Sequence, residues 1–118
     1  MIKILLIASD FNLRQLYHEL LFSKNIEVVP ISTISSAMVL LSLEDFPTIV
    51  IHIDGNSSEA EVFLNLRKKH PTWLKSRILL LTHDPKLGEN LEKSDLMLNT
   101  GQLPPRQIAS KIKSEIYI

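Results

Sequence analysis

Short apolar runs alternate along the chain with segments in which apolar residues recur at the helical spacing of three or four. Five of these runs have the length and composition of buried parallel strands: Ile2–Ile7, Ile26–Ile31, Thr48–Ile53, Ile78–Leu81 and Leu96–Leu98. Pro30 lies in the second run, and because proline cannot donate to a strand ladder, it predicts an edge strand. The pattern therefore predicts an α/β fold: a flavodoxin-like (βα)5 doubly wound sheet of five parallel strands in the order 2-1-3-4-5.

Helical segments follow each predicted strand. The sequence predicts five of them: one capped by Asp10 and ended by Asn25, one over Ser35–Asp45, one opened by the capping-box pair Ser58 and Glu61, a weak one over Asp84–Lys93, and one opened by Pro104-Pro105. We find no linker, repeat or low-complexity tract. A single domain over residues 1–118 therefore accounts for the chain.

Composition narrows the classes of partner and compartment. The chain has 118 residues, of which 45% are hydrophobic, and its 13 basic residues balance its 13 acidic ones. No global field therefore steers it to nucleic acid or to an anionic membrane. It has no cysteine, which excludes disulfides and thiolate nucleophiles. No apolar run is long enough for a membrane span or a signal peptide, so we expect a cytoplasmic protein.

Chemistry in such a sheet lies outside the carboxyl ends of the strands. The polar residues expected there are few: Ser9, Asp10, Asp54, Thr82, His83 and Asn99. The four histidines are scattered without metal-ligand spacing, and no glycine-rich phosphate loop follows the first strand. No His–Asp pair that could complete a Ser-His-Asp catalytic triad with Ser9 can be named from the sequence. We therefore expect no enzyme activity, no cofactor and no resident metal.

Three segments carry a resemblance to a known family. They are Lys3-Ile4-Leu5-Leu6-Ile7 leading into Asp10-Phe11-Asn12-Leu13-Arg14, the strand from Pro47 to Asp54, and Leu79-Leu80-Leu81-Thr82. Together they resemble the response-regulator receiver domain over essentially the whole chain. The resemblance implies the same (βα)5 fold and a place in bacterial two-component signalling.

The resemblance is poor at the residues that carry receiver chemistry. Receivers hold a divalent cation with two acidic residues after the first strand, and those places fall on Ala8 and Ser9. Receivers also have a lysine after the fifth strand that pairs with the phosphoryl group, and its place falls at Asn99 or Thr100. The phospho-acceptor position falls on Ile53, with Asp54 one residue later. Thr82 alone matches directly, which implies a degenerate receiver, or pseudo-receiver.

The expected function is phosphorylation-independent binding to a protein partner. By the resemblance, the surface would be the last strand, with Leu96 and Met97, and the last helix, with Arg106, Lys111 and Lys113. A homodimer through the same surface stays open.

Two alternatives stay open. In one, Asp54 is phosphorylated, Asp10 helps to hold Mg²⁺ and Thr82 contacts the phosphoryl oxygens. In the other, a flavodoxin-like enzyme or small-ligand domain uses Ser9, Thr82 and His83.

Overall fold

The computed structural model describes residues 2–53, 65, 76–83 and 96–116. Within them, five strands form one parallel sheet: β1 (Ile2–Ile7), β2 (Ile26–Ile31), β3 (Thr48–Ile53), β4 (Arg77–Thr82) and β5 (Leu96–Asn99). Their order is β2-β1-β3-β4-β5, as the sequence predicts, and β2, which contains Pro30, lies at an edge. The predicted fold class and topology are confirmed.

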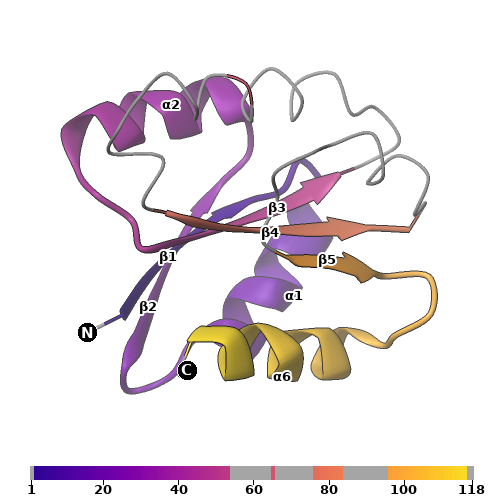
Figure 1. Ribbon diagram of the computed structural model, residues 1–118. Coiled ribbons are helices and arrows are strands. Elements are labelled where there is room, and N and C mark those ends of the chain that lie inside the picture. The colour runs from indigo at the N-terminus through magenta and orange to yellow at the C-terminus, as the bar shows by residue number, and fades with distance from the viewer. Residues whose placement is uncertain (1, 54–64, 66–75, 84–95, 117–118) are drawn as a thin grey trace.

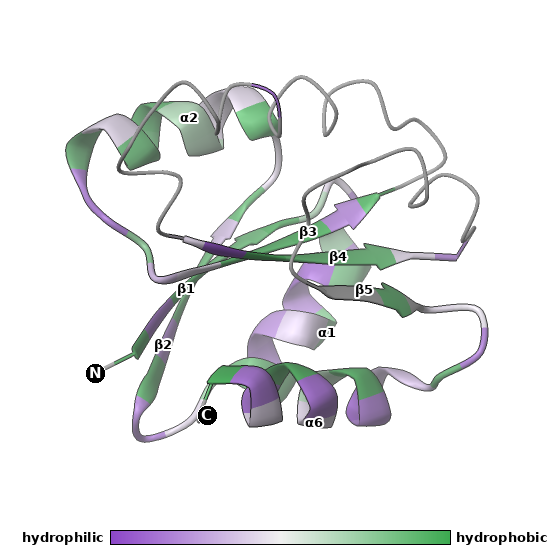
Figure 2. Cartoon of the chain, in the orientation of Figure 1, coloured by the Kyte–Doolittle hydropathy of each residue, from purple (hydrophilic) through white to green (hydrophobic). Residues whose placement is uncertain are grey.

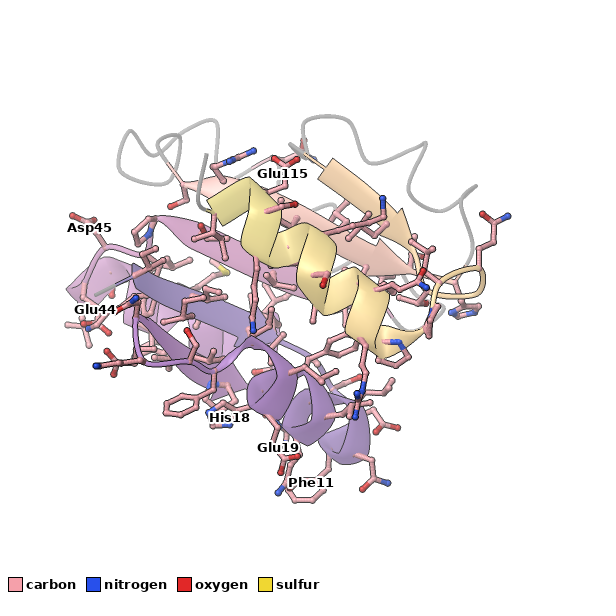
Figure 3. The ribbon with its side chains drawn as sticks, turned by 90° about the horizontal axis from the view of Figure 1, so that it is seen from below. Phe11, His18, Glu19, Glu44, Asp45 and Glu115 are labelled. Atoms are coloured by element: carbon pink, nitrogen blue, oxygen red, sulfur yellow. The ribbon has the colours of Figure 1, made fainter. Side chains whose placement is uncertain are left out.

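Three described helices cover the two faces of the sheet. They are α1 (Phe11–Leu21), α2 (Ile34–Leu43) and α6 (Pro105–Ile116). Figure 1 shows α2 on one face and α1 with α6 on the other. Seen from below, α1 and α6 lie side by side, while Phe11, His18 and Glu19 project from α1 away from α6 (Figure 3). The predicted helices opened by Ser58 and over Asp84–Lys93 lie outside the described residues.

Two helix boundaries differ from the sequence prediction. The first helix ends at Leu21 and not at Asn25, because Phe22 is extended and Ser23 pairs with Ile26 at the start of the next strand. The second helix spans Ile34–Leu43 and not Ser35–Asp45. Thr33 caps it by accepting the Ser36 N–H at 3.1 Å, and Glu44 is extended.

The core consists of two apolar layers, one on each face of the sheet. Alternate strand residues point to opposite faces, so Leu5, Ile49 and Ile51 pack towards α2, whereas Ile4, Leu6 and Val50 pack towards α1 and α6. Figure 2 shows the strands as largely hydrophobic and α6 as divided into a hydrophobic and a hydrophilic side. Both faces are buried, which explains why β1, β3 and β4 are nearly continuous apolar runs.

Candidate functional site

The predicted site residues come together only in part, at the carboxyl ends of the strands. Thr82 is the last residue of β4 and is fully buried, whereas His83, which follows it, is exposed. Asn99 is the last residue of β5. Its place beside Thr82 is fixed by strand register, and the Thr100 N–H donates to the Thr82 carbonyl at 2.8 Å. Asp54 lies outside the described residues.

Strand register decides which residue of β3 stands next to Thr82. The partner of Thr82 on β3 is Ile53. Partners in parallel strands direct their side chains to the same face of the sheet. Ile53 is 3% exposed and belongs to the core layer under α2. The position beside the terminal threonine is therefore held by a buried aliphatic side chain.

The end of β1 has little chemistry of its own. Ala8 is completely buried, and its N–H donates to the Ile31 carbonyl at 3.0 Å, which continues the pairing of β1 with β2. Ser9 is exposed. Asp10 has extended backbone angles, and its Oδ1 accepts the Leu13 N–H at 3.0 Å. Its carboxylate therefore acts as the N-cap of α1, the role that the sequence predicts.

Arg14 is a residue of this corner that sequence reasoning uses only as an alignment anchor. Its Nη1 donates to the Ala8 carbonyl at 2.8 Å and approaches the Ser9 carbonyl at 3.3 Å. The guanidinium also lies 5.5 Å from the ring centroid of Phe11. Its position in the first turn of α1 is the signal that could have suggested a contact with the preceding loop.

His52 and Tyr17 lie on the opposite side of β3 from Ile53. His52 is partly buried, and its ring centroid lies 6.4 Å from that of Tyr17. Tyr17 is 1% exposed, and burial raises the pKa of its phenol above the ordinary value. His52 thus packs at the edge of the core, as its place within an apolar strand indicates.

Several response regulators and receiver domains have solved structures with this architecture. The chemotaxis response regulator CheY4 of Vibrio cholerae aligns with a TM-score of 0.80 at 16% identity, over 97% of this chain and 98% of that one. The signal receiver domain of a histidine kinase from Syntrophus aciditrophicus gives 0.80 at 18% identity, over 97% and 89%. This chain has the fold of a response-regulator receiver domain.

Identities this low show the receiver fold alone. No protein-family model and no curated protein sequence matches this chain. The response regulator TrrA from Thermotoga maritima, solved in complex with Mg²⁺ and BeF, aligns with a TM-score of 0.78 at 19% identity, over 97% of this chain and 98% of that one.

The described residues at the carboxyl ends of the strands are poorly suited to binding a divalent cation. Mg²⁺ requires oxygen ligands in near-octahedral geometry and gives up its water reluctantly. Asp10 has the only carboxylate among the described residues directly after β1, β4 and β5, and that carboxylate caps α1. Within these residues, the donor set does not fit a magnesium site.

No helix among the described residues is long and apolar enough to cross a membrane.

Proposed function

We propose that this chain is a degenerate receiver, a protein-interaction module of bacterial cytoplasmic signalling that works without aspartyl phosphorylation and without enzyme activity. The observation that carries the proposal is the pairing of Ile53 with Thr82. Counted from Pro47, the resemblance to receivers implies that the phospho-acceptor position falls on Ile53, and Ile53 is the strand partner of Thr82. An isoleucine in the core layer has no nucleophilic oxygen.

The β1 end supports the same proposal. Ala8 and Ser9 stand where receivers have two acidic residues, and Ala8 is completely buried. Asp10, the nearest carboxylate, accepts a backbone N–H of α1. A phosphoryl group adds up to two negative charges and needs cations or donors around it. Arg14 is a cation at this end of β1, but its guanidinium donates to the Ala8 and Ser9 carbonyls.

The surface expected to meet a partner is the edge formed by β5 and α6. β5 lies at the end of the sheet opposite β2. Ile108, Ala109 and Ile112 anchor α6 to the sheet, which leaves Arg106 and Lys111 exposed on its outer side. Exposed cations of this kind favour a partner with an acidic surface.

One specific observation favours the alternative of a phospho-receiver that uses Asp54. Thr82 ends β4 in the position that receivers give to a threonine or serine, and it is fully buried at the strand end. In that alternative, the chain would bind Mg²⁺ and a phosphoryl group at this edge. The two functions therefore differ in a property that can be measured directly.

A titration of the native protein with Mg²⁺ and beryllofluoride, followed by backbone amide NMR, separates the two functions. A degenerate receiver leaves the amides of Ser9, Thr82 and Thr100 unshifted, while TrrA under the same conditions serves as the responsive control. Saturable shifts at these three amides would instead support the phospho-receiver.

A further inference from the structure

Among the described helices, α2 differs from the others in having no charged residue. Its ten residues, Ile34–Leu43, are apolar or serine, whereas α1 contains Arg14 and Glu19 and α6 contains Arg106 and Lys111. Figure 2 shows α2 in green and pale tones, while α6 has a purple side. A surface helix ordinarily has charged residues on the side away from the core. The outer side of α2 is therefore not an ordinary solvated helix surface.

Two large aliphatic side chains lie next to each other on this outer side. Val39 is 61% exposed and Leu43 is 77% exposed. They are four residues apart, so they are neighbours on the helix surface. The opposite side of α2, with Ile34, Ala37 and Leu41, is buried against the sheet. Exposed apolar residues that are contiguous indicate an interaction site, which scattered single residues do not.

Three serines complete the outer side, and two of them have hydroxyls bonded to the helix or its cap. Ser35, Ser36 and Ser42 are exposed. The Thr33 hydroxyl donates to Ser36 Oγ at 3.0 Å, and the Ser42 hydroxyl donates to the Val39 carbonyl at 2.6 Å. A partner that covers these two hydroxyls leaves neither without a hydrogen bond, which lowers the cost of removing water. We define Ser35, Ser36, Val39, Ser42 and Leu43 as the α2 outer face.

Charge indicates which partner fits the α2 outer face. In a dimer with two-fold symmetry, a patch meets the same patch of the other copy. A face without charge meets its copy without repulsion, whereas Arg106 and Lys111 on α6 would meet like charges. In an antiparallel pairing, Glu44 and Asp45, which follow α2, would lie near the N-terminus of the second copy's helix, where the helix dipole favours negative charge.

We propose that the α2 outer face binds a second copy of this chain, with the two α2 helices antiparallel and crossing at Val39. Val39 then meets Val39 of the second copy, and the large Leu43 lies against the small Ser35 of the second copy. A helix of ten residues is about 15 Å long. That is short for the about 800 Å² per partner of a standard interface, so the dimer is weak and dissociates on dilution. This inference goes beyond the proposed function and does not depend on it.

Sedimentation equilibrium tests the proposal between about 10 μM and about 1 mM protein, the range in which weak complexes dissociate. The native chain should change from monomer to dimer across this range. Val39→Lys and Val39→Glu should each weaken dimerisation at least about tenfold, because like charges then meet on the two-fold axis. A one-to-one mixture of the two variants should restore dimerisation, because lysine then faces glutamate. This rescue is expected only where position 39 faces itself.

The matched control introduces the same charge on another helix. Gln15 is exposed on α1, and Gln15→Lys should dimerise within about twofold of the native chain, because distant exposed charges are largely screened. A native chain that stays monomeric at the highest concentration would overturn the proposal. So would a Val39→Lys variant that dimerises like the native chain, or variants at position 39 that do not rescue each other when mixed.

The variants should fold normally, since Val39 is exposed and surface substitutions usually change stability little. Thermal unfolding of each variant checks this expectation. A measurement on the native chain needs no variant: the amide signals of Ser35, Val39 and Leu43 should shift with protein concentration, while those of Arg106 and Lys111 should not. The reverse pattern would overturn the proposal. The beryllofluoride titration is read at the strand ends, so it judges the proposed function separately.

Discussion

Replacing Asp10 by alanine should destabilise the protein through the loss of one helix cap. In the native chain, Asp10 Oδ1 accepts the Leu13 N–H at 3.0 Å. An N-cap residue of this type contributes about 0.5–2 kcal/mol relative to alanine. Because Asp10 is exposed, water can reach the freed N–H, so we expect the middle of this range, about 1 kcal/mol.

The corresponding change in melting temperature follows from the size of the chain. Unfolding entropy is about 2.1 cal/mol/K per residue, which for a chain of 118 residues gives about 0.25 kcal/mol/K. A loss of about 1 kcal/mol then lowers Tm by about 4 °C. Differential scanning calorimetry of the native protein and of Asp10→Ala measures this difference directly.

Two further variants separate capping from charge. Asp10→Asn keeps an acceptor oxygen at the cap and should cost only a few tenths of a kcal/mol, about the interaction of one charge with the helix dipole. Thr33→Ala removes the equivalent cap of α2, in which Thr33 Oγ1 accepts the Ser36 N–H at 3.1 Å, and should cost about as much as Asp10→Ala. An unchanged Tm in Asp10→Ala, or an equal loss in Asp10→Asn, would refute the capping role.

Three other predictions concern the core and the sheet ends. Ile53→Ala should lower the free energy of unfolding by about 3 kcal/mol, because Ile53 is 3% exposed in the core layer under α2. Urea unfolding measures this change, and a loss below about 1 kcal/mol would show that the Ile53 side chain is not packed. Burial raises the pKa of the Tyr17 phenol in the folded state. The stability that this difference contributes is therefore complete below the unfolded-state pKa near 10 and is lost as the pH rises towards the folded-state pKa. Tyr17→Phe should remove this contribution to the loss of stability at alkaline pH, measured by unfolding at a series of pH values, and an unchanged pH profile would contradict the prediction. Arg77 donates to the Glu115 carbonyl at 2.5 Å and forms an ion pair with the Glu115 carboxylate, and the two side chains are 41% and 29% exposed. Because solvent screens such a pair, a double-mutant cycle of Arg77→Gln and Glu115→Gln should give a coupling free energy of about 0.5 kcal/mol or less. A coupling above about 2 kcal/mol would show that the pair is much less screened than its exposure indicates.

The sheet could be predicted from the sequence because its signals are local. Strands buried on both faces need continuous apolar runs, and Pro30 restricts its strand to an edge. Helix ends were less predictable, since Asn25 is a reasonable stop for α1 by composition. The chain instead leaves the helix at Phe22, because Ser23 pairs with Ile26 and starts β2 at once.

The candidate site could be predicted only at the level of which residues follow which strand. The place of Ile53 beside Thr82 depends on the register between β3 and β4, which the order of residues along the chain does not give. The contacts of Arg14 could not be predicted in the same way. A long side chain can reach several backbone oxygens, and the geometry of the β1–α1 corner decides which of them it binds.

Labelling of the native protein by acetyl phosphate tests the central claim most directly. Intact-mass spectrometry is carried out with Mg²⁺ present, on the native chain and on Asp54→Asn, with TrrA as the reactive control. We predict no phosphoryl adduct on either form of this chain, because an isoleucine holds the position beside Thr82 and the described edge is poor in metal ligands. A phosphoryl adduct on the native protein that disappears in Asp54→Asn would contradict a phosphorylation-independent receiver.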